Sequence, residues 1–95
     1  MILPYCVYIL QSKRDLLLYH GFTTDIEKRI DDHNAGKTIS TARRRPLKLI
    51  FCEFYLSKKD ALRRESYLKT SQGKRMLKLM LKDTLKQIDY PKKEG

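Results

Sequence analysis

Two helix-start signals, each directly after a strand-like apolar run, most strongly constrain what this 95-residue chain can fold into. Thr24-Asp25-Ile26-Glu27 and Ser57-Lys58-Lys59-Asp60 have the spacing of a capping box, in which two side chains three residues apart satisfy backbone groups at a helix start. The runs before them are rich in Leu, Tyr and Phe, a composition typical of strands. A chain of this length forms one domain, so these signals predict a small mixed fold.

The first apolar runs predict an antiparallel hairpin. Residues 5–10 and 16–22 are strand-like, and the polar residues 11–15 between them form a turn. If Ser12 and Asp15 face each other across the turn, Tyr8 lies opposite Tyr19 on the same face of the sheet. A longer loop shifts that register. Residues 47–56 predict a third strand, and their imperfect alternation is typical of a strand covered on both faces.

The helical segments complete the predicted order. The first helix ends at Asn34-Ala35-Gly36, and residues 37–46 form a basic loop. The second helix follows Ser57, Gly73 interrupts the pattern, and apolar residues from Met76 to Leu81 predict a third helix. We therefore predict an α/β (α+β) fold in the order β-β-α-β-α-α, with three helices covering a three-stranded sheet. Residues 1–82 form the domain, and residues 83–95 form a polar C-terminal tail whose last few residues are frayed.

The positive charge is concentrated in the second part of the chain. Residues 1–36 carry a net charge of −1 and residues 37–95 a net charge of +11, for a total of +10. Such a field attracts polyanions, so a nucleic acid, DNA or RNA, is the predicted partner; an anionic membrane surface and simple hydration of the surface are the alternatives. The candidate nucleic-acid-binding residues are Arg43, Arg44, Arg45, Lys69, Lys74, Arg75 and Lys78.

The chain has the features of a cytoplasmic protein. No apolar stretch is long enough to span a bilayer, and residues 1–5 lack the basic start of a secretory signal. Cys6 and Cys52 lie in strand-like runs, which predicts two buried thiols in a reducing compartment. Two isolated cysteines do not make a zinc site.

Five separated polar residues carry the chemistry. Tyr8 and Tyr19 lie on the predicted hairpin, Arg29 and His33 are four residues apart on the first helix, and Glu65 is on the second helix. Two phenols, a guanidinium, an imidazole and a carboxylate suit metal-assisted phosphodiester cleavage. Each residue alone also fits an ordinary surface or packing role, and Glu65 has Arg64 and Lys69 as potential ion-pair partners. The hypothesis rests on the five together.

These residues resemble the GIY-YIG nuclease domain over roughly residues 5–82. In that family a small three-stranded antiparallel sheet is flanked by helices, and its members cut DNA with a divalent metal. Two positions depart from the pattern, with Cys6 in place of glycine and His20 in place of an aliphatic residue; a polar position that follows the metal-binding helix has no secure match. The stretches that carry the resemblance are Cys6-Val7-Tyr8, Tyr19-His20-Gly21, Arg29 with His33, residues 45–50 and residues 60–70.

The resemblance implies a role for each of the five residues. Glu65 is the sole protein ligand of Mg²⁺ or Mn²⁺, which suits an ion that keeps much of its water shell. Arg29 contacts the scissile phosphate, and Tyr19 positions the water or the phosphate. Tyr8 orients the attacking water or deprotonates it. His33 relays a proton, and whether Tyr8 or His33 is the general base stays open.

Three functions are compatible with these features. The first is a metal-dependent DNA endonuclease, structure-selective and linked to DNA repair or recombination. The second is a non-cleaving nucleic-acid-binding module on the same fold, and the third is a basic adaptor that binds protein. Because all five site residues are present, we favour the endonuclease. The sequence does not choose between a monomer and a weak dimer.

Overall fold

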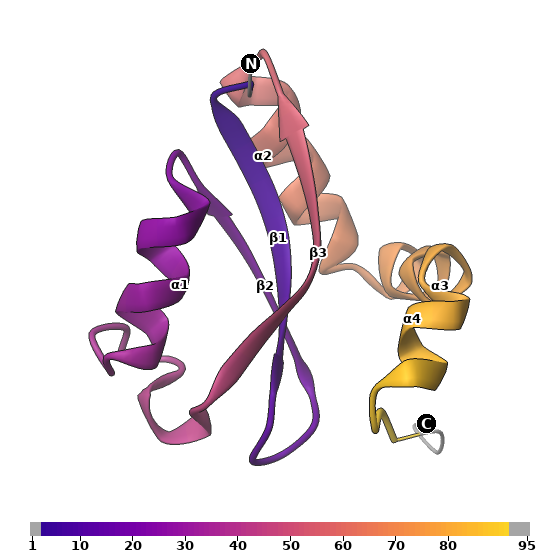
Figure 1. The fold of residues 1–95 in the computed structure, drawn as a ribbon. Coiled ribbons are helices and arrows are strands. Elements are labelled where there is room, and N and C mark those ends of the chain that lie inside the picture. Colours follow the sequence, from indigo (N-terminus) through magenta and orange to yellow (C-terminus); the bar gives the residue numbers. More distant parts are fainter. Residues whose placement is uncertain (1–2, 92–95) are drawn as a thin grey trace.

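A central strand with a partner on each side organises the chain. The computed structural model describes residues 3–91 (Figure 1). Its sheet is antiparallel in the order β2-β1-β3, so the predicted three-stranded sheet is confirmed. The elements are β1 (Tyr5–Ser12), β2 (Leu18–Thr23), α1 (Ile26–Asn34), the 3-10 turn η1 (Ala42–Arg44), β3 (Leu47–Tyr55), α2 (Lys58–Leu68), α3 (Ser71–Met80) and α4 (Lys82–Gln87).

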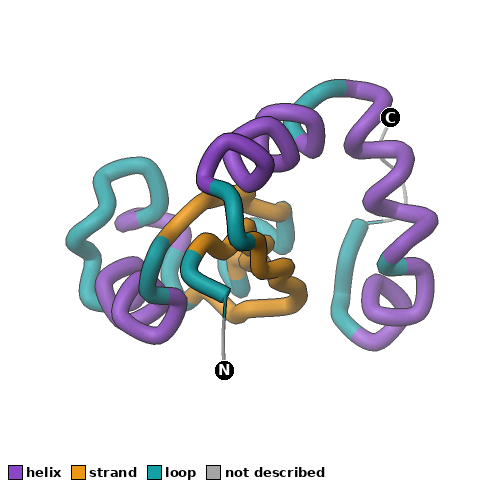
Figure 2. The backbone as a smooth tube through the Cα atoms, turned by 90° about the horizontal axis from the view of Figure 1, so that it is seen from above, coloured by secondary structure: helices purple, strands orange, loops and turns teal. Residues whose placement is uncertain are grey.

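Both faces of β1 are covered, and its side chains alternate between two cores. Val7 and Ile9 belong to the cluster with Ala61, Leu68 and Leu77 of α2 and α3. The neighbouring residues Cys6, Tyr8 and Leu10 belong to a second cluster, which packs against Ile26 and Ile30 of α1. The helices accordingly lie on both sides of the sheet, α1 on one and α2 on the other (Figures 1 and 2). The strand alternation thus directs odd and even residues of β1 to different surroundings.

The hairpin has a longer loop than the turn considered from sequence. Tyr8 pairs with Gly21, and Leu10 pairs with Tyr19, so the register with Tyr8 opposite Tyr19 is wrong by two residues. The loop is closed by the amide of Ser12 donating to the carbonyl of Leu17, and Leu16 has a φ of 66°. Because a shift of two preserves the face, Tyr8 and Tyr19 still share one side of the sheet.

A bulge explains the imperfect alternation of β3. Ile9 pairs with Phe51 and Leu10 pairs with Leu49, so Ile50 is the extra residue. Leu49 packs in the α1-side cluster, whereas Phe51 packs in the other. The strand is covered on both faces, as predicted, although most of its side chains are only half-buried.

The starts of α1 and α3 differ from their sequence predictions. The N-cap of α1 is Asp25, whose carboxylate accepts from the amide of Lys28 at 3.1 Å; Thr24 is not the cap. Ser57 caps α2 as predicted. Gly73 lies inside α3 and does not end a helix, since Thr70 is the N-cap. A side chain at Gly73 would overlap the backbone of Tyr67 and Leu68, so this glycine allows two helices to approach closely.

A fourth helix occupies the beginning of the predicted tail. Helix α4 was not predicted because six mainly polar residues give little periodicity. Leu85 nevertheless packs against the apolar core. Residues 92–95, where fraying was predicted, lie outside the described residues. Within residues 3–91, no helix has the length and apolar content required to cross a bilayer.

Candidate active site

Tyr8 is held by a buried chain of hydrogen bonds that begins on the central strand. Its hydroxyl lies 2.9 Å from Nε2 of His33, and Nδ1 of His33 lies 2.7 Å from the hydroxyl of Thr41. None of these residues exceeds 1% exposure. The even face of β1 presents Tyr8 to α1, and the last turn of α1 presents His33 in return. Two residues predicted as catalytic are therefore in direct contact.

Tyr19 and Gly21 complete the surroundings of the Tyr8 ring. The ring of Tyr19 lies 6.4 Å from that of Tyr8 and 5.1 Å from that of His33, measured between centroids. Gly21 lies opposite Tyr8 in the ladder, and a methyl group there would overlap the Tyr8 ring. The glycine of this motif is thus required by the space that the phenol occupies.

Arg29 and Glu65 act on Tyr8 through their charges. Burial is the main cause that raises the pKa of Tyr8 well above its ordinary value; Tyr19 and Glu65 raise it further, whereas Arg29 lowers it. Arg29 is half-buried on α1, and Glu65 is half-buried on α2. Helices on opposite sides of the sheet thus bring a cation and an anion within electrostatic reach of one phenol.

His33 is neutral near pH 7. Burial, and secondarily the charge of Arg29, lowers the pKa of His33. A neutral imidazole has one N–H donor and one acceptor nitrogen. If Nδ1 donates to Thr41, Nε2 accepts from the Tyr8 hydroxyl; in the other tautomer both directions are reversed. The first arrangement leaves Tyr8 with a base at 2.9 Å.

The carboxylate of Glu65 is paired with Lys69. Its Oε2 lies 3.2 Å from Nζ of Lys69, one helical turn away, and its side chain is 18% exposed. Arg64, the other partner considered from sequence, instead binds Glu53 through two contacts of 2.9 and 3.1 Å. Within residues 3–91, no three His, Cys, Asp or Glu residues cluster as a metal site. Any ion at Glu65 would therefore take most of its ligands from water and substrate.

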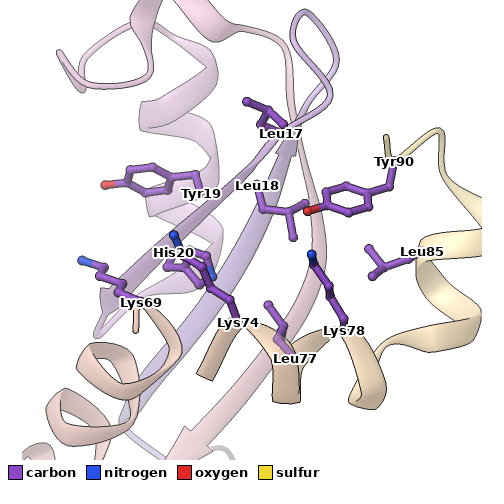
Figure 3. Close-up of a pocket in the computed structure, with 10 residues that line it drawn as sticks. All are labelled: Leu17, Leu18, Tyr19, His20, Lys69, Lys74, Leu77, Lys78, Leu85 and Tyr90. Atoms are coloured by element: carbon purple, nitrogen blue, oxygen red, sulfur yellow. The ribbon is translucent and has the colours of Figure 1, made fainter. Parts of the chain in front are cut away.

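The predicted nucleic-acid-binding residues form two separate groups. Arg43 and Arg45 line a hollow together with Arg14. Arg44 lies between them in the sequence, but its guanidinium binds Asp15 at 2.7 Å, and its carbonyl accepts from Ser12. Through these two contacts, Arg44 holds the basic loop of residues 37–46 against the hairpin. Lys69, Lys74 and Lys78 line a different pocket beside β2 (Figure 3), while Arg75 is exposed on α3.

Thr41 and Asn34 are the contributions that the sequence did not reveal. Thr41 lies in an irregular loop, so no periodicity relates it to His33. The side-chain amide of Asn34 donates to the carbonyl of Leu47 at 3.0 Å, and its oxygen accepts from the Leu47 amide at 2.7 Å. These bonds tie the end of α1 to the start of β3. A polar residue at the end of a helix was visible in the sequence, but its partner was not.

The two residues that depart from the usual motifs are Cys6 and His20. Cys6 is buried, whereas the other cysteine, Cys52, is half-buried and so less buried than predicted; both are free thiols. Burial raises the pKa of Cys6 to about 12, so this thiol stays protonated. His20 lies on the opposite face from Tyr19 and lines the pocket beside β2.

Comparison with known proteins identifies relatives over most of the chain. The family model described as the GIY-YIG catalytic domain matches residues 4–78. A UPF0213 protein of Staphylococcus haemolyticus is 45% identical over 75 residues, which cover 78% of this chain and 90% of that protein. A UPF0213 protein of Clostridium perfringens is 40% identical over 87 residues, covering 90% and 92%.

A solved structure has the same fold. The solution NMR structure of a UPF0213 protein from Bacillus halodurans matches with a TM-score of 0.53 and 30% sequence identity. The match covers 92% of this chain and 98% of that one. The names of these relatives state a family and no activity.

Proposed function

Because the chain belongs to the GIY-YIG catalytic domain family, we propose that it is a divalent-metal-dependent endonuclease that hydrolyses phosphodiester bonds in DNA. The observation that carries the proposal is the buried contact of 2.9 Å between Tyr8 and a neutral His33. Burying an imidazole between two hydroxyl groups is costly for stability unless each hydrogen bond is made. A phenol with a base at hydrogen-bond distance is suited to moving a proton.

In this proposal Tyr8 and His33 act as a pair. Tyr8 alone is a poor base, because its raised pKa disfavours the phenolate. As water attacks phosphorus, the phenol oxygen takes a proton from that water, and the phenol passes its own proton to Nε2 of His33. This transfer requires the tautomer in which Nδ1–H of His33 donates to the Thr41 hydroxyl, and we assign Thr41 the role of accepting that hydrogen bond. Thr41 is thus a positioning residue.

Arg29 and Tyr19 hold the phosphate. The planar guanidinium donates to two oxygens at once and stays charged at any working pH. Charge on the phosphate oxygens grows in the transition state, and a half-buried cation is well suited to stabilise it. Tyr19 packs on the His33 ring, and its hydroxyl is available to orient the same phosphate or the water.

Glu65 fits a hard divalent cation as its single protein ligand. It is a half-buried carboxylate, and such a site suits Mg²⁺ or Mn²⁺, which keep waters and accept phosphate oxygens as further ligands. Bound there, the ion would supply positive charge to the leaving oxygen. The ammonium of Lys69 at 3.2 Å would then turn from Glu65 to the DNA backbone.

The cationic side chains supply the binding surface for the strand. We assign Arg43 and Arg45 to one group, and Lys69, Lys74, Arg75 and Lys78 to the other. Arg44 takes part only indirectly, by holding the loop. This surface binds the phosphate backbone, which carries no sequence information, so we propose weak sequence preference. Action in repair or recombination is an extension of the same proposal.

A cleavage assay tests the function. Labelled duplex, single-stranded and branched DNA, with RNA beside them, are incubated with Mg²⁺, Mn²⁺ or EDTA. Wild type, Glu65→Ala and Lys59→Ala are compared; Lys59 is an exposed lysine in the first turn of α2, outside the site. We expect metal-dependent cutting by wild type and Lys59→Ala, and none by Glu65→Ala. Equal cutting by all three, with or without EDTA, would reject the assignment.

The pair between Glu65 and Lys69 favours a second candidate, a nucleic-acid-binding module that does not cut. An ammonium already neutralises the carboxylate that a metal would need. In that case every variant binds DNA with the same steep dependence on salt, and no substrate is cut at any metal concentration.

A further inference from the structure

A pocket of about 560 Å³ lies next to the proposed active site, on the other side of β2. Its size is within the range of about 300–1,000 Å³ typical of small-ligand sites. Figure 3 shows side chains from the hairpin, from α3 and from the C-terminal segment pointing into one space. The lining residues are Leu17, Leu18, Tyr19, His20, Lys69, Lys74, Leu77, Lys78, Leu85 and Tyr90.

The rim of the pocket is cationic. Three lysines and no carboxylate are among its lining residues. Their charge reaches the interior: burial, and then the charges of Lys74 and Lys69, lower the pKa of His20 to about 4. A concave site with charge of one sign favours a ligand of the opposite sign, so the occupant carries an anionic group.

The interior of the pocket is apolar and aromatic, with one unused polar atom. Leu18, Leu77 and Leu85 form its walls, and the half-buried ring of Tyr90 faces Leu18 (Figure 3). The Nε2 atom of His20 is buried and has no hydrogen-bond partner among residues 3–91. Since buried polar atoms are normally paired, this nitrogen is a place for a ligand to form a hydrogen bond. A flat heteroaromatic ring with polar edges matches these walls.

The pocket and the active site share side chains. Lys69 lines the pocket and contacts Glu65 at 3.2 Å. Tyr19 also lines the pocket, while its ring packs against Tyr8 and His33. One residue therefore separates the carboxylate from the pocket. A strand with its phosphate at Glu65 has a neighbouring nucleotide within reach of this space.

We propose that this pocket binds one unstacked nucleotide of the DNA strand, next to the bond that is cut. The phosphate lies against the lysines, and the base lies between the leucines and Tyr90, with an edge toward His20. The proposal rests on the proposed function. It deepens that function, because a nucleotide can enter only where it has left the stack, which costs least where the DNA is unpaired or damaged. The pocket thereby selects substrates by DNA structure.

An abasic-site scan tests the base contact. Substrates with one abasic residue, placed successively at each position around the cut, are given to wild type, Tyr90→Ala and Lys59→Ala. For wild type and Lys59→Ala we expect cutting to fall about tenfold at one offset, since stacking one base on an aromatic ring contributes about 1–3 kcal/mol. Tyr90→Ala cuts all of these substrates equally and more slowly. A wild type that is insensitive to abasic position, yet cuts DNA, would overturn the pocket assignment and leave the proposed function intact.

If wild type cuts no DNA, a binding measurement distinguishes failure of the nucleotide pocket from failure of the proposed endonuclease function. Deoxynucleoside monophosphates and inorganic phosphate are titrated in EDTA, with amide shifts followed by NMR. Saturable shifts of Leu18, Leu77 and Leu85, larger for the nucleotide than for phosphate and lost in Tyr90→Ala, support the nucleotide site by themselves. No shift, or the same shifts with phosphate alone, would reject it.

Discussion

The two faces of β1 show opposite uses of neighbouring residues. Ile9 lies in an apolar core against α2 and α3, and its surroundings supply packing. Tyr8, the next residue, lies in a core of similar burial but ends in hydrogen bonds to His33. If the proposed function holds, the alternation of a single strand separates stability from chemistry by one position. We therefore expect substitutions on one face of this strand to lower activity and substitutions on the other face to lower stability.

The largest contrast is between Tyr8→Phe and Ile9→Val. Tyr8→Phe removes the hydroxyl that contacts His33, and we expect cleavage to fall by about 10²–10⁴-fold, the usual contribution of a positioned acid–base group. Ile9→Val removes one buried methyl, which costs about 1 kcal/mol of unfolding free energy with activity per folded molecule retained. Urea unfolding and single-turnover cleavage at equal folded concentration measure both. Similar activity of the two variants would contradict the division.

Two glycines extend the comparison beyond β1. Gly21→Ala places a methyl in the space of the Tyr8 ring, which moves the phenol from His33. We expect about a 10²-fold loss of cleavage, since a misplacement near 1 Å has effects of this order. Gly73→Ala overlaps the backbone of Tyr67 on the other side. We expect Gly73→Ala to lower the urea midpoint of unfolding while activity per folded molecule is retained. A loss of activity per folded molecule in Gly73→Ala would contradict the difference between the two glycines.

Substitutions of Thr41 test whether its hydroxyl positions His33 on the α1 side of the sheet. Thr41→Val keeps the shape but removes the hydroxyl that contacts Nδ1 of His33. The loss of one hydrogen bond, about 1 kcal/mol, predicts a cleavage rate lower by about fivefold to tenfold. Thr41→Ser should restore most of the rate and the same pH–rate profile. A Thr41→Val enzyme with an unchanged profile would show that the hydroxyl only packs.

The last prediction is a dependence of stability on pH, to which one histidine on each face of the sheet contributes. The folded-state pKa is lowered for His20, to about 4, and for His33. The unfolded chain, with histidine pKa values near 6.5, therefore binds more protons in acid. Stability is full above about pH 6.5 and falls as the pH drops toward 4. Urea midpoints at pH 7 and pH 5 measure this loss, and His20→Leu should reduce the difference between them.

The sequence predicted those parts of the fold that depend on local pattern. The strand runs, the end of α1 at Asn34 and the cap at Ser57 follow from residue type and spacing. The hairpin register was wrong by two residues because the loop closes between Ser12 and Leu17, not between Ser12 and Asp15. Within this loop Leu16 has a positive φ, which its residue type does not signal. The bulge at Ile50 was visible only as weak alternation.

The candidate site was predictable as a set but not as a geometry. The contact between Tyr8 and His33 joins residues 25 positions apart, and only the packing of α1 on the sheet creates it. Thr41 had no signal in the sequence, since an irregular loop has no period. The ion pair between Arg44 and Asp15 likewise depends on a contact between two loops. Long-range pairing of this kind is what a single sequence does not display.

The extra residue in β3 also affects how copies of the chain meet. β3 is an edge strand of nine residues, and an edge of that length is a template on which a strand of another molecule can pair. A bulge increases local twist and bends the strand, so a straight foreign strand cannot follow it for its whole length. The bulge at Ile50 thereby makes this edge a poorer template for fibre-like association between copies of the chain.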